Sequence, residues 1–167
     1  MQVIVLATEE QKAQFAENKG GITWIDDASA LAGYSSADAL IDLQFEPTNE
    51  RIAILASMLP KPVIINSVAH TLQDTHPDFI RINGWNTFLS APIWEAACRD
   101  EQKRQKAEVV FHFLGKNVEW LPDSPGFVTA RVVSMIINEA YLALEEGVST
   151  KDEMNTAMKL GTAYPYG

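Results

Sequence analysis

The 167-residue sequence is poor in cysteine and in positive charge, and it has no long apolar run. A single cysteine excludes an intramolecular disulfide framework and fits a reducing compartment. The formal net charge of −9 argues against nucleic acid and against anionic membranes, because both would repel the chain. No apolar stretch reaches the roughly 20 residues of a membrane-spanning helix, and the opening MQVIVLATEEQ lacks a secretory-signal pattern. We expect a soluble, cytoplasmic, globular protein.

Short apolar runs alternate with helical patterns along the first two thirds of the chain. Continuous apolar runs of this length are typical of strands buried on both faces. The expected strands are 3–6, 22–25, 39–45, 63–65, 80–82 and 118–121, with helices at 9–18, at 49–59 and after Asp100. This alternation predicts an α/β fold, with a mostly parallel sheet covered by helices on both faces.

The pattern changes after residue 121. Asp123-Ser124-Pro125 offers two capping side chains and a proline for the start of a helix from about 126 to 146. Thr150 and Glu153 form a capping box for a last helix that reaches Leu160. We expect two domains, an α/β domain over 1–121 and a short all-α segment over 122–167.

The long helix predicts a homodimer. Its apolar residues cover more than one stripe, so it needs burial on two sides. The sequence after it is too short to wrap it, and a contiguous exposed apolar patch is rare on monomers. Twofold pairing of the same helix is the simplest closed arrangement. The expected interface residues are Val133, Ile136, Ile137, Ala140 and Leu144.

Three stretches of the sequence resemble one enzyme family. Residues 123–167, DSPGFVTARVVSMIINEAYLALEEGVSTKDEMNTAMKLGTAYPYG, are similar to the start of the C-terminal domain of 3-hydroxyacyl-CoA dehydrogenases. ADALIDLQFE and RINGWNTFLSAPIW resemble, in order, later Rossmann strands and the active-site loop of that family. The resemblance covers about 27–167. It implies a reduced, Rossmann-like domain, a truncated helical dimerisation domain and a place in fatty-acid or hydroxybutyryl-CoA metabolism.

The resemblance places four functional positions of the family on residues without suitable chemistry. The family's catalytic histidine corresponds to Asn86, and its paired glutamate falls at Cys98 on an ungapped count. The substrate-binding asparagine corresponds to Ala130, and a serine of the family corresponds to Val68. Asparagine does not titrate, so it cannot take a proton from a 3-hydroxyl group. We interpret the loop as an active site without its chemistry.

The turn after the first strand also departs from the family. A dinucleotide site needs glycines there, so that backbone amides reach the pyrophosphate. This turn instead reads Leu6-Ala7-Thr8-Glu9-Glu10-Gln11. Asp26 has the spacing of a ribose-binding acid, but its segment resembles the family's third strand, which implies that the second strand is deleted. No cofactor is expected, and NAD in particular is not expected.

The remaining candidates are few. Ligand contacts are assigned to Asn66, Ser67, Trp85, Asn86 and Trp94. Cys98 is expected in the core, and the histidines show no metal-ligand spacing, so no metal site is expected. Two functions remain open. The chain is either a non-catalytic, homodimeric binding or regulatory protein for an acyl-CoA-like small molecule, or an oxidoreductase of the same family with a rewired site.

Overall fold

The structure is a computed structural model that describes residues 1–15 and 20–162. The chain divides into two compact units, Met1–Val128 and Thr129–Gly167. The residues between 122 and 128, which we had grouped with the helical segment, therefore pack with the sheet. Each unit is described by itself.

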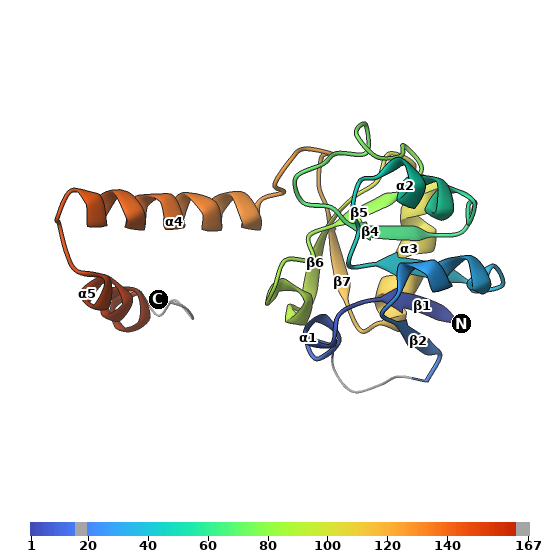
Figure 1. Cartoon of the computed structure of the whole chain (residues 1–167), viewed down its shortest axis with the longest axis horizontal. Coiled ribbons are helices and arrows are strands. Elements are labelled where there is room, and N and C mark those ends of the chain that lie inside the picture. Colours follow the sequence, from blue (N-terminus) through green and yellow to red (C-terminus); the bar gives the residue numbers. More distant parts are fainter. Residues whose placement is uncertain (16–19, 163–167) are drawn as a thin grey trace. The chain divides into compact units, whose positions relative to one another are not determined.

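The first unit contains a seven-stranded sheet in the order β2-β1-β3-β4-β5-β6-β7 (Figure 1). Neighbouring strands are parallel except for β5 and β6, which are antiparallel. The strands are β1 (Val3–Leu6), β2 (Ile22–Ile25), β3 (Ala39–Asp42), β4 (Val63–Asn66), β5 (Ile80–Ile82), β6 (Ile93–Ala97) and β7 (Asn117–Trp120). The expected mostly parallel sheet is confirmed.

One expectation about the sheet is wrong. Residues 22–25 pair directly with β1, and Ile25 lies opposite Leu6. This strand therefore occupies the place of the second strand of a doubly wound sheet, and the second strand is not deleted. Sequence similarity misplaced it because a four-residue apolar run carries too little information to distinguish two edge strands.

Strand alternation sends side chains to two separate cores. Val3 and Val5 belong to the core beneath α3 (Glu101–Phe113), whose buried residues are Ala107, Val110 and Phe111. Ile4 and Leu6 face the opposite side, where Leu31 of η1 (Ala28–Tyr34) and Leu55 of α2 (Asn49–Ala56) cover them. Helical elements thus cover both faces of the sheet, as expected.

The first helix is shorter than expected. α1 (Glu9–Lys12) begins at a capping box between Thr8 and Gln11 and ends at Ala13, and the end of the predicted helix at 16–18 lies outside the described residues. The Gln11 side chain also donates to the Leu43 carbonyl at 2.9 Å. This contact ties the turn after β1 to the end of β3.

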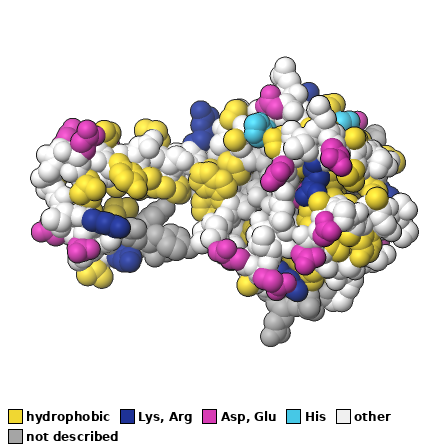
Figure 2. All heavy atoms as spheres, in the orientation of Figure 1, with side chains coloured by type: hydrophobic (Ala, Val, Ile, Leu, Met, Phe, Trp, Pro, Cys, Tyr) yellow, Lys and Arg dark blue, Asp and Glu magenta, His cyan; other side chains and the backbone are white. Residues whose placement is uncertain are grey.

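The second unit contains α4 (Thr129–Glu145), α5 (Lys151–Thr156) and the π-helical turn η3 (Ala157–Gly161). α4 starts later than expected because Gly126 and Phe127 have left-handed backbone angles, with φ of 85° and 48°. Apolar side chains gather along α4 (Figure 2), and several are about half exposed or more, including Met135, Ile137, Tyr141 and Leu142. In the described part of the chain, no helix is long and apolar enough to cross a bilayer.

Candidate functional site

A cavity of about 320 Å³ lies at the carboxyl edge of the parallel strands. Ligands of open α/β sheets bind outside this edge, and the volume is at the lower end of the range for ligand pockets. The wall is made by residues at or beyond the ends of β3, β4 and β5: Phe45, Pro47, Asn66, Ser67, Val68, Ala69, His70 and Trp85. The cavity is therefore the candidate functional site, and it brings together four expected positions, 66, 67, 68 and 85.

Asn66 acts as a clip between strand ends. Its Nδ2 donates to the carbonyls of Leu43 at 3.1 Å and Gly84 at 3.3 Å, and its Oδ1 accepts from the Gly84 amide at 2.9 Å. A Cβ added at Gly84 would lie 2.8 Å from Asn66 Cγ, so this approach requires glycine. The clip fixes the floor of the cavity, and it engages both polar atoms of the Asn66 side chain.

The cavity loop, residues 67–72, forms one wall. Ser67 is buried, and its Oγ donates to the His70 carbonyl at 2.9 Å. Asp74 accepts from the amide and the hydroxyl of Thr71, both at 2.8 Å, which closes the loop on itself. His70 is exposed, and it is the one histidine among the described lining residues.

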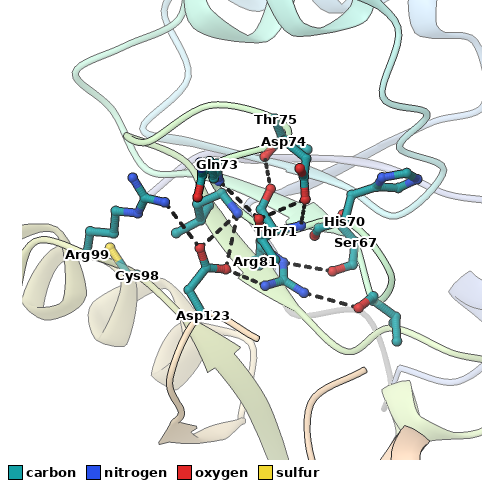
Figure 3. A network of polar contacts seen from close by, with 12 residues as sticks. Ser67, His70, Thr71, Gln73, Asp74, Thr75, Arg81, Cys98, Arg99 and Asp123 are labelled. Atoms are coloured by element: carbon teal, nitrogen blue, oxygen red, sulfur yellow. Dashed lines mark hydrogen bonds and ion pairs between the residues drawn. The ribbon is translucent and has the colours of Figure 1, made fainter. Parts of the chain in front are cut away.

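Behind the cavity loop, Arg81 of β5 forms an ion pair with Asp123 (Figure 3). Arg81 is fully buried, and Asp123 is largely buried. Asp123 was expected to cap a helix, but the helix begins at Thr129, and the carboxylate binds Arg81, Arg99 and the Leu72 amide instead. The segment before α4 is thus joined to the cavity wall.

Asn86, to which the resemblance assigns the position of the family's histidine, lies outside the cavity lining. Its Nδ2 donates to Glu10 Oε1 at 2.8 Å, and its Oδ1 accepts from Gln14 Nε2 at 2.8 Å. The next residue, Thr87, has a φ of 74°, which is strained for a β-branched side chain. The loop is therefore held in a defined conformation by α1 and its own turn, with a neutral amide where the family has an imidazole.

Trp94 does not line the cavity, contrary to the sequence-based assignment. It is 1 % exposed, faces α3 from β6 and donates its Nε1 to the Leu89 carbonyl at 3.2 Å. Alternate β6 positions point to the core, and sequence proximity to the loop did not reveal which face Trp94 takes. Trp85 is the tryptophan that reaches the cavity.

Cys98 does not stand in for a catalytic carboxylate near the loop. It follows the far end of β6, is 3 % exposed and donates its Sγ to the Asp100 carbonyl at 3.5 Å. Cys98 is thus a core cysteine, and its burial raises the pKa of the thiol. A carboxylate does occur on β6 at Glu95, where it accepts from Asn83 Nδ2 at 2.9 Å and from the Val128 amide at 3.2 Å.

The other expected positions lie in the second unit. Ala130 is buried in the first turn of α4. Of the five interface candidates, Val133 and Ile136 are half-buried, whereas Ile137, Ala140 and Leu144 are exposed. The interface stays a prediction.

Sequence reasoning missed several residues of the site. Phe45, Pro47 and His70 line the cavity, and Arg81 and Asp123 support it, but none of them was assigned to ligand binding. The one available signal was position, because these residues follow strand ends that a parallel sheet brings to the same edge. Among the described residues, no group of three His, Cys, Asp or Glu side chains is arranged to hold a metal ion.

Comparison with known proteins identifies the relationship suggested by the sequence. Residues 126–167 match the family described as 3-hydroxyacyl-CoA dehydrogenase, C-terminal domain. The 3-hydroxyadipyl-CoA dehydrogenase of Escherichia coli K12 is 43% identical over 75 residues, 45% of this chain and 16% of that enzyme. The 3-hydroxybutyryl-CoA dehydrogenase of Clostridioides difficile is 41% identical over 58 residues, 32% of this chain and 21% of that enzyme. The matched part is therefore a small share of each relative.

Solved structures extend the likeness to the sheet. (S)-3-hydroxybutyryl-CoA dehydrogenase from Ralstonia eutropha has a TM-score of 0.70 at 22% identity, over 87% of this chain and 56% of that chain. 3-Hydroxybutyryl-CoA dehydrogenase from E. coli K12 gives 0.68 at 20% identity, over 87% and 33%. The sheet of the first unit thus has a Rossmann-like fold, which it shares with these structures. The C-terminal segment is in addition similar in sequence to the C-terminal domain of the 3-hydroxyacyl-CoA dehydrogenases.

These findings contradict the expectation that the chain has no cofactor and that NAD in particular is not expected. The two relatives and the two structural neighbours named above are dehydrogenases. One neighbour, with a TM-score of 0.69 at 18% identity over 89% of this chain and 52% of that chain, is described as an NAD⁺ dependent dismutase. The structure also removes one ground for the expectation, because the second strand is present in β2.

The residues at this edge fit a dinucleotide in one half. Asp26 is exposed directly after β2, next to the end of β1, where the ribose-binding acid of a doubly wound fold stands. The turn at Ala7–Gln11 differs, because it has no glycine and places Glu9 and Glu10 at the start of α1. Asp26 thus has the position of a ribose-binding acid, whereas the turn after β1 differs from the glycine-rich turn that binds a pyrophosphate.

Proposed function

We propose that this chain is a 3-hydroxyacyl-CoA dehydrogenase-like binding or regulatory protein that does not carry out the dehydrogenase proton transfer and that acts as a homodimer. The observation that carries the proposal is the amide of Asn86, hydrogen-bonded to Glu10 and Gln14 at the histidine position. The expected ligand of the cavity is an acyl-CoA-like small molecule.

Oxidation of a 3-hydroxyl group requires a base within hydrogen-bond reach of the hydroxyl proton. The Asn86 amide offers no basic lone pair at neutral pH. Its orientation is also fixed, because it donates to a carboxylate and accepts from another amide. A loop held in this way supports binding by shape and hydrogen bonding rather than proton transfer at residue 86.

An assay of NADH oxidation with acetoacetyl-CoA tests the absence of catalysis. We expect no rate above the buffer blank, and measurable turnover by the unmodified protein would contradict the proposal. Binding is tested separately by thermal unfolding, because a ligand at about 100 times its dissociation constant stabilises a protein by about 2.7 kcal/mol. Absence of any shift with acetoacetyl-CoA would remove the acyl-CoA-like ligand from the proposal.

A second candidate function is an oxidoreductase with a rewired site, and His70 favours it. This histidine lies on the cavity wall beside Ser67, and imidazole is the side chain most suited to proton transfer near neutral pH. The two candidates are separated by a single variant. If turnover is found and His70→Gln abolishes it while leaving ligand binding intact, the rewired enzyme is supported; if no turnover is found, it is rejected.

The homodimer rests on α4. Ile137 and Leu144 of the expected interface are each more than 40% exposed within the chain, and a contiguous exposed apolar surface is rare on monomers. Pairing of the same surface with a second copy would bury it on both copies at once. Light scattering on the purified chain decides between dimer and monomer.

A further inference from the structure

One ion pair holds both ends of the cavity loop 67–72. Arg81 donates its Nε to the Ser67 carbonyl at 2.9 Å and its Nη2 to the Val68 carbonyl at 3.1 Å. Asp123 accepts from the Leu72 amide with both carboxylate oxygens, at 3.0 and 3.1 Å. Arg81 Nη1 then donates to Asp123 itself, so the two ends are joined through the pair (Figure 3).

The carboxylate of this pair comes from a segment distant in sequence, the linker segment 122–128 that leads into α4. The same segment adds two further contacts, one to the cavity loop and one to Arg81. The Gly126 amide donates to the Val68 carbonyl at 2.7 Å, and the Phe127 ring lies 4.7 Å from the Arg81 guanidinium carbon. Val68 lines the cavity, and its carbonyl oxygen is therefore shared between β5 and the linker segment.

Burial makes this arrangement cooperative. The Arg81 side chain is fully buried, and a buried guanidinium is tolerated only while its hydrogen-bond partners and counter-charge are in place. Displacing the linker segment would remove Asp123, the Phe127 ring and the Gly126 amide together. Displacing the cavity loop would remove the two carbonyl acceptors. Either change leaves the same buried charge unsatisfied, so the two segments should loosen together.

We propose that Arg81 and Asp123 are positioning residues that couple the cavity to the linker segment, so that a ligand in the cavity orders the chain leading into α4. The ligand part of this inference rests on the proposed function, whereas the coupling of the two segments does not. Coupling of this kind is reciprocal, so a change that loosens the linker segment also weakens ligand binding.

Hydrogen exchange on the ligand-free protein tests the coupling. Asp123→Asn removes the counter-charge and keeps the size of the side chain, and Asp74→Asn is the matched control. Asp74 accepts hydrogen bonds from Thr71, close to the cavity loop. Among the described contacts, Asp74 makes none to the linker segment. We expect Asp123→Asn to speed exchange by about tenfold at both Leu72 and Gly126, within the usual range of coupling between sites. Asp74→Asn should affect the loop alone.

Two outcomes would overturn the coupling. One is faster exchange in the cavity loop of Asp123→Asn with unchanged exchange at Gly126. The other is faster exchange at both Leu72 and Gly126 in Asp74→Asn. That result would mean that exchange at these amides reports a general loss of stability and not the ion pair. If Asp123→Asn does not fold, Phe127→Leu removes the ring beneath Arg81 and keeps the ion pair, and it should produce the same joint loss to a smaller extent.

The ligand part is tested with acetoacetyl-CoA and, separately, with NADH. Binding of either probe should slow exchange at Gly126 in the unmodified protein, and Asp123→Asn should weaken that binding by about tenfold. Binding without any effect at Gly126 would overturn transmission to the linker segment. If neither probe binds, the ligand part fails together with the proposed function, while the ligand-free exchange still judges the coupling.

Discussion

Lys116 donates its Nζ to the Leu89 carbonyl at 2.6 Å and to the Ala91 carbonyl at 2.9 Å, and so holds the end of the loop that begins at Asn86. The rings of Trp94 and Phe15 lie 5.4 and 5.8 Å from the same nitrogen. The described partners of this buried ammonium group are thus carbonyl oxygens and aromatic faces. Burial lowers the pKa of Lys116 below its usual value.

This lysine predicts a rise of stability with pH in the alkaline range. Because the folded pKa is lowered, the unfolded chain binds more protons between that pKa and 10.5, and the free energy of unfolding rises through this window. As the pH rises toward 10.5, we expect the free energy of unfolding of the unmodified protein to increase relative to that of Lys116→Met. Urea unfolding at several pH values measures it.

Lys106→Met, at an exposed position of α3, is the control, and it should leave the pH dependence unchanged. Parallel stability profiles for the unmodified protein and Lys116→Met would show that Lys116 does not titrate differently on folding, and this prediction would be withdrawn.

Removing one partner of the ion pair between Asp42 and Arg51 should lower the free energy of unfolding strongly. Asp42, at the end of β3, is fully buried, and Arg51 Nε of α2 donates to its Oδ2 at 2.7 Å. Arg51→Gln leaves a buried carboxylate without its counter-charge, which costs about 3–5 kcal/mol when a buried pair is broken. The double variant Asp42→Asn with Arg51→Gln should recover most of this loss in urea unfolding.

The same pair fixes the direction of an acid effect. Burial raises the pKa of Asp42 above its usual 3.8, and Arg51 opposes this shift. The contribution of such a carboxyl group to stability is present at low pH and is lost as the pH rises through the folded pKa. Arg51→Gln should raise that pKa further, so its deficit in unfolding free energy should be largest near neutral pH and shrink on acidification. A deficit that grows with acid would contradict the assignment.

The central sheet could be predicted from the sequence because its signals are local. Residues 3–6 are a continuous apolar run, residues 80–82 place two isoleucines on either side of Arg81, and the observed strand bounds agree with both. The start of α4 could not be predicted, because it depends on the left-handed backbone of Gly126 and Phe127, which are held by Val68 and Arg81. Contacts between residues distant in sequence decide where α4 begins, and the periodicity of apolar residues carries no information on such contacts.

The site was predicted less well than the sheet, for a related reason. An ungapped count placed the carboxylate partner at Cys98, although the strand carries its carboxylate at Glu95. Counting along the chain carries no information on which positions the fold brings next to the loop. His70 was missed because a single histidine in a loop gives no sign of the cavity that the fold builds beside it.

The position of Cys98 predicts the failure of a simple reconstruction. Asn86→His should not produce 3-hydroxyacyl-CoA dehydrogenase activity, because residue 86 lies outside the cavity lining and its side chain is turned to Glu10 and Gln14. Adding Cys98→Glu should not help, since position 98 is buried at the far end of β6 from the loop. This second change should instead destabilise the protein, because it buries an unpaired acid. Assays of NADH oxidation and thermal unfolding check both expectations, with Cys98→Ala as the control; activity in the double variant would show that the geometry is wrong.

The apolar stripe of α4 predicts the oligomeric state. Val133, Ile136, Ile137, Ala140 and Leu144 recur at intervals of three and four residues and so lie on one face of the helix. Burial of each side chain larger than alanine contributes about 1.5–3 kcal/mol, and several such contributions can exceed the cost of association. We expect a homodimer at micromolar concentration, and Ile137→Asp or Ile136→Asp should give monomers or insoluble protein. Asn138→Asp adds the same charge at an exposed polar position of α4 and should leave the dimer intact. Light scattering measures all four proteins, and a monomer for the unmodified chain would rule out the homodimer and the regulatory role that depends on it.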